Sequence, residues 1–479
     1  MKRNFVTNLA LLLLLNLLVK PIYAFGIDVG VQNAVGATDY GNYFILLNFS
    51  IIFQIILDLG IENFSRREIA RHTNMVNKYF SFIFPLKLTL GLVYFVFCSV
   101  IGLIIGWRGH EFTILLVLLF NQFLASFVLY FRANLGGMHM FRADSIVSVI
   151  DRFVVIVICG FLLLDPVTRN AFRIEWLIYS QTAAYLISAS LAFSLVFSRT
   201  GMEPFRFNLR YYRMVLNQSL PYAVLILLMA TYLRIDSVLV GKLLDNGTEQ
   251  AGIYAQAFRI IEILSNYGYL FTLILLPVFS KMLKQGDPVE HLTRLSFTLL
   301  MVPALIAAAL CLGYRHEIME LLYKQHLETS SDVLAVLTMS FLGICMTYIY
   351  GTLLTANGSL RQLISMALFA VVVNITLNLI LIPRMGILGA AFANATTQLF
   401  AAFYQIILVR RIFKFKADIS FKVRITFYIV LLAVATWLSR MLPLTWIYSA
   451  LILVGFGIAL SFLFRLIRPL SFRKVLENK

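Results

Sequence analysis

Apolar runs of about twenty residues recur along almost the whole chain, and they constrain its fold more than any other feature. A helix needs roughly 20 apolar residues to cross the hydrocarbon core of a bilayer, which is about 30 Å thick. Fourteen segments meet this requirement: 5–31, 42–62, 79–106, 112–135, 145–164, 174–198, 214–241, 251–279, 295–314, 333–356, 362–382, 387–409, 425–440 and 446–464. The sequence therefore predicts an all-α, polytopic membrane protein with about fourteen transmembrane helices.

Composition excludes a soluble protein and argues against an enzyme. Hydrophobic residues make up 60% of the 479 residues and charged residues only 13%, whereas soluble domains have about 45–50% and about 25%. The chain has no H-E-x-x-H, P-loop or nucleophile-elbow string, and its longest connection spans only 315–332. The four cysteines lie in apolar runs and are expected to be buried: Cys98, Cys159, Cys311 and Cys345. We expect no enzymatic activity, catalytic residue, metal or cofactor.

The first span begins like a secretory signal peptide. Two basic residues precede an apolar run, and Tyr23-Ala24-Phe25 resembles a cleavage site. The apolar character resumes after Lys20-Pro21, however, and continues to Val31. Because that length is enough to cross a bilayer, we expect a retained first helix with a proline kink.

Positive charge is distributed unevenly between the two sides of the predicted helices. With fourteen spans both termini lie on one side, and the loops of that side hold most of the 40 Lys and Arg residues. Basic loops remain in the cytoplasm, so both termini are predicted to be cytoplasmic. The net charge of +17 thus indicates orientation and contact with anionic membrane lipids rather than binding of nucleic acid.

Two similar stretches indicate an internal repeat. Thr38–Tyr43 enters the second predicted helix and Glu249–Tyr254 enters the eighth, and each contains Gly-x-Tyr before a long apolar run. Six helices separate them, so the two halves have the same orientation, as in many transporters. We expect an N-terminal six-helix lobe at 1–198, a cytoplasmic linker at 199–213, a C-terminal six-helix lobe at 214–416, and two additional helices with a basic cytoplasmic tail at 417–479.

Three local strings, together with this architecture, resemble those of a known transporter family. They are VGATDYG at 35–41, DLGI at 58–61 and LIPRMGILGAA at 381–391. The chain resembles the Wzx-type O-antigen and polysaccharide flippases of the multidrug/oligosaccharidyl-lipid/polysaccharide (MOP) exporter superfamily. The resemblance covers nearly the whole chain, and its motifs are more specific for the superfamily than for a substrate.

The resemblance implies a function and partners. The chain would move undecaprenyl-pyrophosphate-linked oligosaccharides from the inner to the outer leaflet of the bacterial cytoplasmic membrane by alternating access. Its partners would be the lipid-linked glycan, membrane lipids and the polysaccharide polymerase machinery. One alternative is a cation-coupled multidrug exporter of the same superfamily, which would use buried carboxylates. Another is a membrane enzyme such as a polymerase or glycosyltransferase, which usually needs a larger aqueous loop.

Nine charged residues within the predicted spans provide the candidates for a substrate site: Lys20, Lys87, Arg152, Arg234, Arg259, Asp58, Asp151, Asp236 and Glu262. Ionisable groups at membrane depth are costly and usually face a cavity or a partner. Basic side chains would suit an anionic headgroup, since an arginine matches phosphate oxygens. We predict a headgroup site of four residues: Lys20, Arg234, Arg259 and Lys87.

The spacing of these charges leads to more specific expectations. Pro21 follows Lys20 and is expected to act as a hinge, because proline bends a helix. Arg234 and Asp236 lie about 200° apart around a helix and cannot share a face, and Asp236 is the candidate for binding a coupling proton or sodium ion. Arg259 is expected to pair with Glu262, three residues away.

The remaining charges are expected to be structural. Asp151 and Arg152 lie near the start of the predicted span 145–164 and would form an interfacial packing pair. Asp58 lies near the cytoplasmic end of its helix, where it would offset the positive charge of Arg66 and Arg67.

Overall fold

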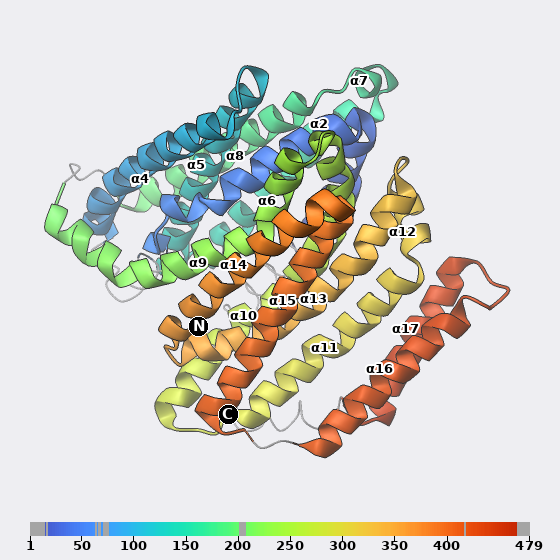
Figure 1. Ribbon diagram of the computed structural model, residues 1–479. Coiled ribbons are helices and arrows are strands. Elements are labelled where there is room, and N and C mark those ends of the chain that lie inside the picture. The colour runs from blue at the N-terminus through green and yellow to red at the C-terminus, as the bar shows by residue number, and fades with distance from the viewer. Residues whose placement is uncertain are drawn as a thin grey trace. The chain divides into compact units, whose positions relative to one another are not determined.

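A computed structural model describes residues 15, 18–62, 65, 69, 76–200, 207–415 and 418–466. Within these ranges the chain is helical, with no strand (Figure 1). Twelve of the helices in the described part are long and apolar enough to cross a membrane. The chain is therefore a multi-pass, all-α membrane protein, as its apolar runs predict.

The twelve predicted spans from 79–106 onward each correspond to one of these helices, most of them within five residues at each end. The first two predicted spans differ. The described part of the first is helical from residue 18, and the π-helix η1 (Ile22–Asp28) leads directly into α2 (Val29–Ile52). Gly36 interrupts α2 with φ 83° and ψ 175°, a conformation that favours glycine. This break separates the first span from the second.

The second predicted span was expected to continue to residue 62, and that expectation is wrong. Regular helix ends at Ile52 and is followed by the short 3₁₀-helix η2 (Gln54–Leu57). Leu59 and Gly60 then take positive φ values of 42° and 83°. A side chain from another helix stabilises this break, as described below.

The chain divides into two compact units, Met1–Ala255 and Gln256–Lys479. The first contains η1, α2, η2 and the following helices: α4 (Val76–Ile105), α5 (His110–Gly137), α6 (Phe141–Leu164), α7 (Pro166–Asn170), α8 (Ile174–Thr200) and α9 (Leu209–Leu243). Here α8 packs on α5 and α6, and α9 packs on α2. The expected second lobe would begin with α9, whereas the first compact unit includes this helix. The compact units therefore differ from the proposed repeats, and the lobes at 1–198 and 214–416 stay a prediction.

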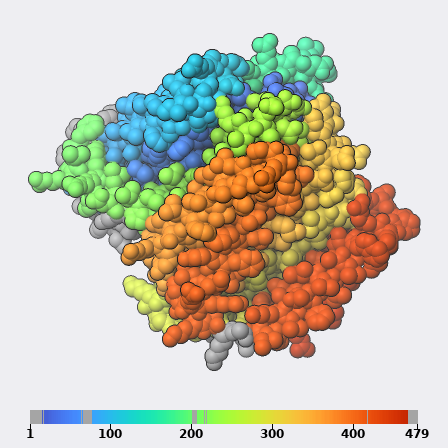
Figure 2. All heavy atoms as spheres, in the orientation of Figure 1, coloured from blue at the N-terminus to red at the C-terminus, as the bar shows by residue number. Residues whose placement is uncertain are grey.

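The second unit begins within α10 (Gly247–Gln285), which crosses the division. It continues with α11 (Glu290–Gly313), α12 (Arg315–Leu322), α13 (Leu327–Ala356), α14 (Leu360–Met385), α15 (Ile387–Phe413), α16 (Ile419–Ser439) and α17 (Trp446–Leu463). The helices α16 and α17 pack on each other and on α11, and no other helix covers their outer side in Figure 2, where they are red. Both helices carry exposed apolar residues, such as Trp437 and Leu451, which suits contact with lipid.

The two Gly-x-Tyr stretches meet each other within the first unit. A Cβ atom added at Gly41 would collide with the carbonyl oxygen of Thr248, and one added at Gly252 would collide with the carbonyl oxygen of Ala37. The buried Gln32 also donates from Nε2 to the carbonyl oxygen of Gly252, at 2.8 Å. Glycine therefore allows the two backbones to approach more closely than any side chain would permit.

Buried side chains elsewhere agree with the sequence. All four cysteines are buried and free, as predicted. In the first unit an aromatic core joins α4, α5 and α8 through Phe80, Tyr130, Phe131 and Phe193. Two of the helices that it joins, α4 and α5, carry Lys87 and Arg132 of the next section.

Candidate functional site

Lys20 lies at a point where the first helix changes its winding. The next residue, Pro21, keeps helical dihedral angles (φ −64°, ψ −39°) and caps the π-helix η1. The irregularity therefore takes the form of π-helical turns after the proline, a feature frequent at functional sites. The Lys20 side chain is exposed, and its charged neighbours are Arg152, Arg132 and Asp151.

Arg152 belongs to the same cluster and is held on an aromatic ring. Its guanidinium carbon lies 4.7 Å from the centroid of the Tyr23 ring, within the range of a cation–π contact. It also hydrogen-bonds to Tyr185, and its Nε lies 3.7 Å from Oδ2 of Asp151. The side chain of Arg152 remains 33% exposed. Arg152 was expected to be an interfacial residue, but it lies in the middle of α6.

Arg132 is tied to a carboxylate of its own. Its Nε donates to Oδ1 of Asp144 at 2.7 Å, and the Asp144 side chain is only 8% exposed. This contact joins the end of α5 to the start of α6. Arg132 therefore contributes less positive charge to the cluster than Lys20 and Arg152 do.

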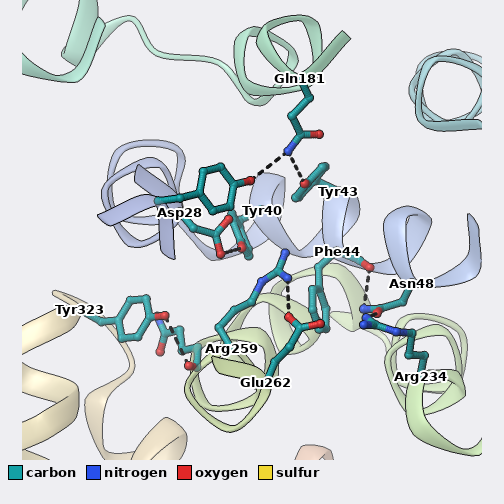
Figure 3. A network of polar contacts seen from close by, with 12 residues as sticks. Asp28, Tyr40, Tyr43, Phe44, Asn48, Gln181, Arg234, Arg259, Glu262 and Tyr323 are labelled. Carbon is teal, nitrogen blue, oxygen red and sulfur yellow. Dashed lines mark hydrogen bonds and ion pairs between the residues drawn. The ribbon is translucent and has the colours of Figure 1, made fainter. Parts of the chain in front are cut away.

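A network of hydroxyl and amide groups connects this cluster to α2 and α8 (Figure 3). Nε2 of Gln181 donates to the hydroxyl of Tyr43 at 2.9 Å and to that of Tyr23 at 3.3 Å. On the neighbouring side of α2 the Tyr40 hydroxyl donates to Oδ2 of the buried Asp28 at 2.8 Å. Tyr23 thus contacts both the guanidinium of Arg152 and the amide network.

Arg234 and Asp236 lie on α9 and point to different partners, as their spacing predicts. Nη1 of Arg234 donates to Oδ1 of Asn48 at 2.6 Å, and Nδ2 of Asn48 donates to the carbonyl oxygen of Phe44 (Figure 3). Asp236 is 1% exposed, and its Oδ2 accepts a hydrogen bond of 3.5 Å from the Tyr254 hydroxyl. Arg234 is half-buried and the more accessible of the two.

Lys87 lies apart from these cations and is buried, with 2% exposure. Its Nζ donates to the carbonyl oxygen of Leu57 at 2.9 Å and to Oγ of Ser126 at 2.5 Å, and lies 3.5 Å from Oδ1 of Asp58. Asp58 in turn accepts backbone N–H groups of Gly60 and Glu62. These contacts stabilise the break at the end of α2, and they leave Lys87 no surface for a headgroup in this conformation.

Asp58 also lines a cavity of about 230 Å³ beside the break. The other lining residues come from α2, η2, the segment just after η2, α5 and α9 and are mostly apolar: Ile51, Ile52, Gln54, Ile55, Glu62, Ser126, Leu129, Ile226 and Ala230. Asp58 was expected to offset Arg66 and Arg67, which lie outside the described residues. Among the described residues Asp58 pairs with Lys87, and the expectation about Arg66 and Arg67 stays a prediction.

In the second unit Arg259 forms the ion pair that its spacing predicts. Its Nη1 lies 2.7 Å from Oε2 of Glu262 (Figure 3). One turn earlier, the carbonyl oxygen of Gln256 accepts a hydrogen bond of 3.4 Å from the Tyr323 hydroxyl. To bind an anion, the guanidinium of Arg259 would have to contact the anion and Glu262 at the same time or break its ion pair with Glu262.

Within the first unit the predicted site residues Lys20, Lys87 and Arg234 have different neighbours. The structure brings Lys20 together with Arg152 and Arg132, which sequence reasoning left out, and places Arg234 with Asn48. Lys87 and Arg259 each have a carboxylate partner. Among the described residues no group of three or more His, Cys, Asp or Glu side chains is placed to hold a metal ion.

Comparisons with known proteins give the wider context of this geometry. A family model described as polysaccharide biosynthesis protein matches residues 5–283, more than half of the chain. No curated protein sequence matches the chain.

Three solved structures share the fold at low identity. The lipid II flippase MurJ in an inward closed conformation has a TM-score of 0.69 at 15% identity, covering 97% of this chain and all of MurJ. An inward-facing MATE multidrug-resistance transporter of the MOP superfamily has a TM-score of 0.64 at 13% identity, covering 82% and 94%. A MOP transporter from Pyrococcus furiosus, described as having a binding pocket of reversed polarity, has 0.61 at 14% identity, covering 85% and 95%. At these identities the likeness shows the fold alone.

Proposed function

We propose that this chain, which belongs to the polysaccharide biosynthesis protein family and has the fold of the MOP superfamily, moves lipid-linked oligosaccharides across a membrane. The substrate would be an undecaprenyl-pyrophosphate-linked repeat unit, carried from the inner to the outer leaflet of the bacterial cytoplasmic membrane. Both termini would be cytoplasmic, and the polymerase machinery would receive the glycan.

The observation that carries this proposal is the cluster of cations inside the first unit. Arg152 lies on the membrane-spanning helix α6 and stacks on Tyr23, which follows Lys20 by three residues, and both cations retain exposed surface. An unpaired charge in hydrocarbon costs many kcal/mol, so an anionic headgroup needs protein groups that replace water. Exposed cations at membrane depth supply such groups, while the polyprenyl tail stays in the lipid.

Arg234 and Arg259 would extend the headgroup site, Asp236 would bind the coupling proton or sodium ion, and Pro21 would act as the hinge. The chain contains no ATP-binding string, so transport would draw on ion gradients, membrane potential or consumption of the product. The similarity in fold to a protein described as a lipid II flippase supports this assignment, because a flippase also carries its substrate across a membrane.

The experiment that tests the proposal is a flipping assay with the full chain in liposomes. The liposomes contain an undecaprenyl-pyrophosphate-linked oligosaccharide, and a glycosidase added outside measures how much of the glycan reaches the outer leaflet. The wild-type chain should make the inner pool accessible, and the Lys20→Ala/Arg234→Ala variant should not. Arg169→Ala, at an exposed position on α7, is the matched control. Normal flipping by the well-folded double variant would remove these residues from the site.

A cation-coupled multidrug exporter is the second candidate, favoured by two buried carboxylates. Asp28 and Asp236 each accept a hydrogen bond from a tyrosine hydroxyl, and carboxylates of this kind suit cationic drugs. Overexpression in a drug-sensitive strain distinguishes the two functions. Drug resistance without glycan flipping would favour the exporter.

A further inference from the structure

We propose that Arg152 is a headgroup-binding residue that acts together with Lys20, each taking one phosphate of a diphosphate, and that the Tyr23 ring positions it. This inference rests on the proposed function and adds a residue to its site. It follows from the depth, exposure and partners of Arg152.

The depth of Arg152 excludes an interfacial role. The predicted span 145–164 placed this residue near a helix end, but α6 begins at Phe141 and ends at Leu164. Arg152 therefore lies near the middle of a membrane-spanning helix. A charged side chain there is costly unless it faces water, a partner or a ligand.

The exposure of the side chain indicates which of these it faces. The Arg152 side chain is 33% exposed and that of its neighbour Asp151 is 18% exposed, while Lys20 is exposed. Exposed charges at mid-membrane are incompatible with contact to lipid tails. These groups therefore line a space that water or a polar headgroup occupies.

The contacts of Arg152 fix its orientation and leave donors for a ligand. A guanidinium has five N–H donors in a planar fork. The Tyr23 ring contacts the guanidinium through a cation–π interaction, Tyr185 takes a hydrogen bond, and Asp151 lies at 3.7 Å, beyond hydrogen-bond length. The donors that Tyr185 does not use can bind phosphate oxygens in pairs.

The local charge favours an anion. Three cations meet here, and Arg132 is neutralised by Asp144 at 2.7 Å. Arg152 stacks on the ring of Tyr23, three residues after Lys20, and the carboxylate of Asp151 lies 3.7 Å from the Nε of Arg152. Two cations that repel each other gain stability when an anion lies between them. A diphosphate, with charge on two linked groups, matches this pair better than a monophosphate.

Tyr23 acts as a positioning residue. Its ring lies against the guanidinium of Arg152, and its hydroxyl accepts a hydrogen bond from Gln181. Gln181 is anchored in turn to Tyr43 on α2. The ring therefore holds Arg152 in one orientation, which spares the headgroup the entropic cost of ordering a long side chain.

The test measures binding of undecaprenyl pyrophosphate and undecaprenyl monophosphate to the purified full chain in nanodiscs. The wild-type chain should prefer the diphosphate. Arg152→Gln should weaken diphosphate binding about ten- to hundredfold, the effect of losing a charge-assisted contact, and bind the monophosphate with little change. Arg152→Lys keeps the charge without the planar fork, and its affinity for the diphosphate should lie between those of the wild-type chain and Arg152→Gln. Asp151→Asn, which removes the opposing carboxylate, should not weaken binding.

Two variants of Tyr23 separate positioning from general packing. Tyr23→Phe keeps the ring and should retain the diphosphate preference, whereas Tyr23→Leu should reduce it. An unchanged preference in both Arg152→Gln and Arg152→Lys would overturn the inference, even if flipping by the wild-type chain is normal. A wild-type chain that neither binds nor flips the diphosphate-linked lipid would instead refute the proposed function.

Discussion

Replacing Lys87 by methionine determines whether this lysine holds the fold or binds substrate. The sequence placed Lys87 in the headgroup site, but the residue is only 2% exposed and its ammonium group contacts Leu57, Ser126 and Asp58. Methionine has a similar length and no charge. The substitution therefore removes the three polar contacts while leaving most of the packing.

The size of the effect follows from what is left behind. Removing one partner of a buried ion pair costs about 3–5 kcal/mol, because the other charge remains without compensation. Asp58 is 26% exposed and keeps the backbone N–H groups of Gly60 and Glu62, so we expect the lower end, about 3 kcal/mol. For a unit of this size that corresponds to a fall in Tm of roughly 6–12 °C.

A thiol-reactive dye measures this change, because the cysteines are buried and free and react only as the chain unfolds. Adding Asp58→Asn to Lys87→Met should recover part of the lost Tm, since the carboxylate is then neutral. Lys20→Met is the matched control, and it should lower headgroup binding with little change in Tm. A Lys87→Met variant with an unchanged Tm and no flipping would refute the reasoning and return Lys87 to the substrate site.

Three further predictions concern single contacts. Gly252→Ala inserts a methyl group between two backbones in contact and should destabilise the chain by about 1–3 kcal/mol, measured as a lower Tm. The N–H of Phe421 bonds to Asp418 at 3.0 Å and, with a nearby arginine, holds the pKa of that carboxyl below its usual value. The stabilising effect of this carboxylate on α16 is therefore complete above about pH 4 and is lost as the pH falls through the lower folded pKa. The hydrogen-exchange protection of the first turn, relative to the intrinsic rate at each pH, should fall in acid in the wild-type chain but not in Asp418→Asn. Asn48→Asp gives Arg234 a carboxylate partner that competes with an anion, and should slow flipping more than Asn48→Ala does.

The fold could be predicted where local composition decides it. Twelve spans follow from apolar runs alone, because a bilayer fixes the length that a helix must have. The break after Ile52 could not be predicted, since its main stabilising side chain, Lys87, lies thirty residues further along the chain. No local signal besides Gly60 marks the place where regular helix ends.

The site could be predicted only where its partners are close in sequence. The pairing of Arg259 with Glu262 follows from their spacing on one helix and is confirmed at 2.7 Å. The link between Gln181 and Tyr43 joins residues 138 positions apart, and amides and tyrosines in apolar helices usually indicate ordinary packing. Arg152 was left out for a different reason: the predicted start of its helix was four residues late, which placed a mid-membrane arginine at the interface.

The cations of this chain differ in how much charge they can offer an anion, and their partners decide this more than their depth does. Lys87 and Arg259 each lie beside a carboxylate, so an anion must either compete with that carboxylate or bind a pair with no net charge. Arg152 also lies near a carboxylate, but its contact with Asp151 is long, at 3.7 Å, and its guanidinium stacks on Tyr23, which follows the second cation, Lys20, by three residues. We therefore expect headgroup binding to involve Lys20, just before η1, and Arg152 on α6, where the π-helical turns after Pro21 place a change of helix winding next to Lys20.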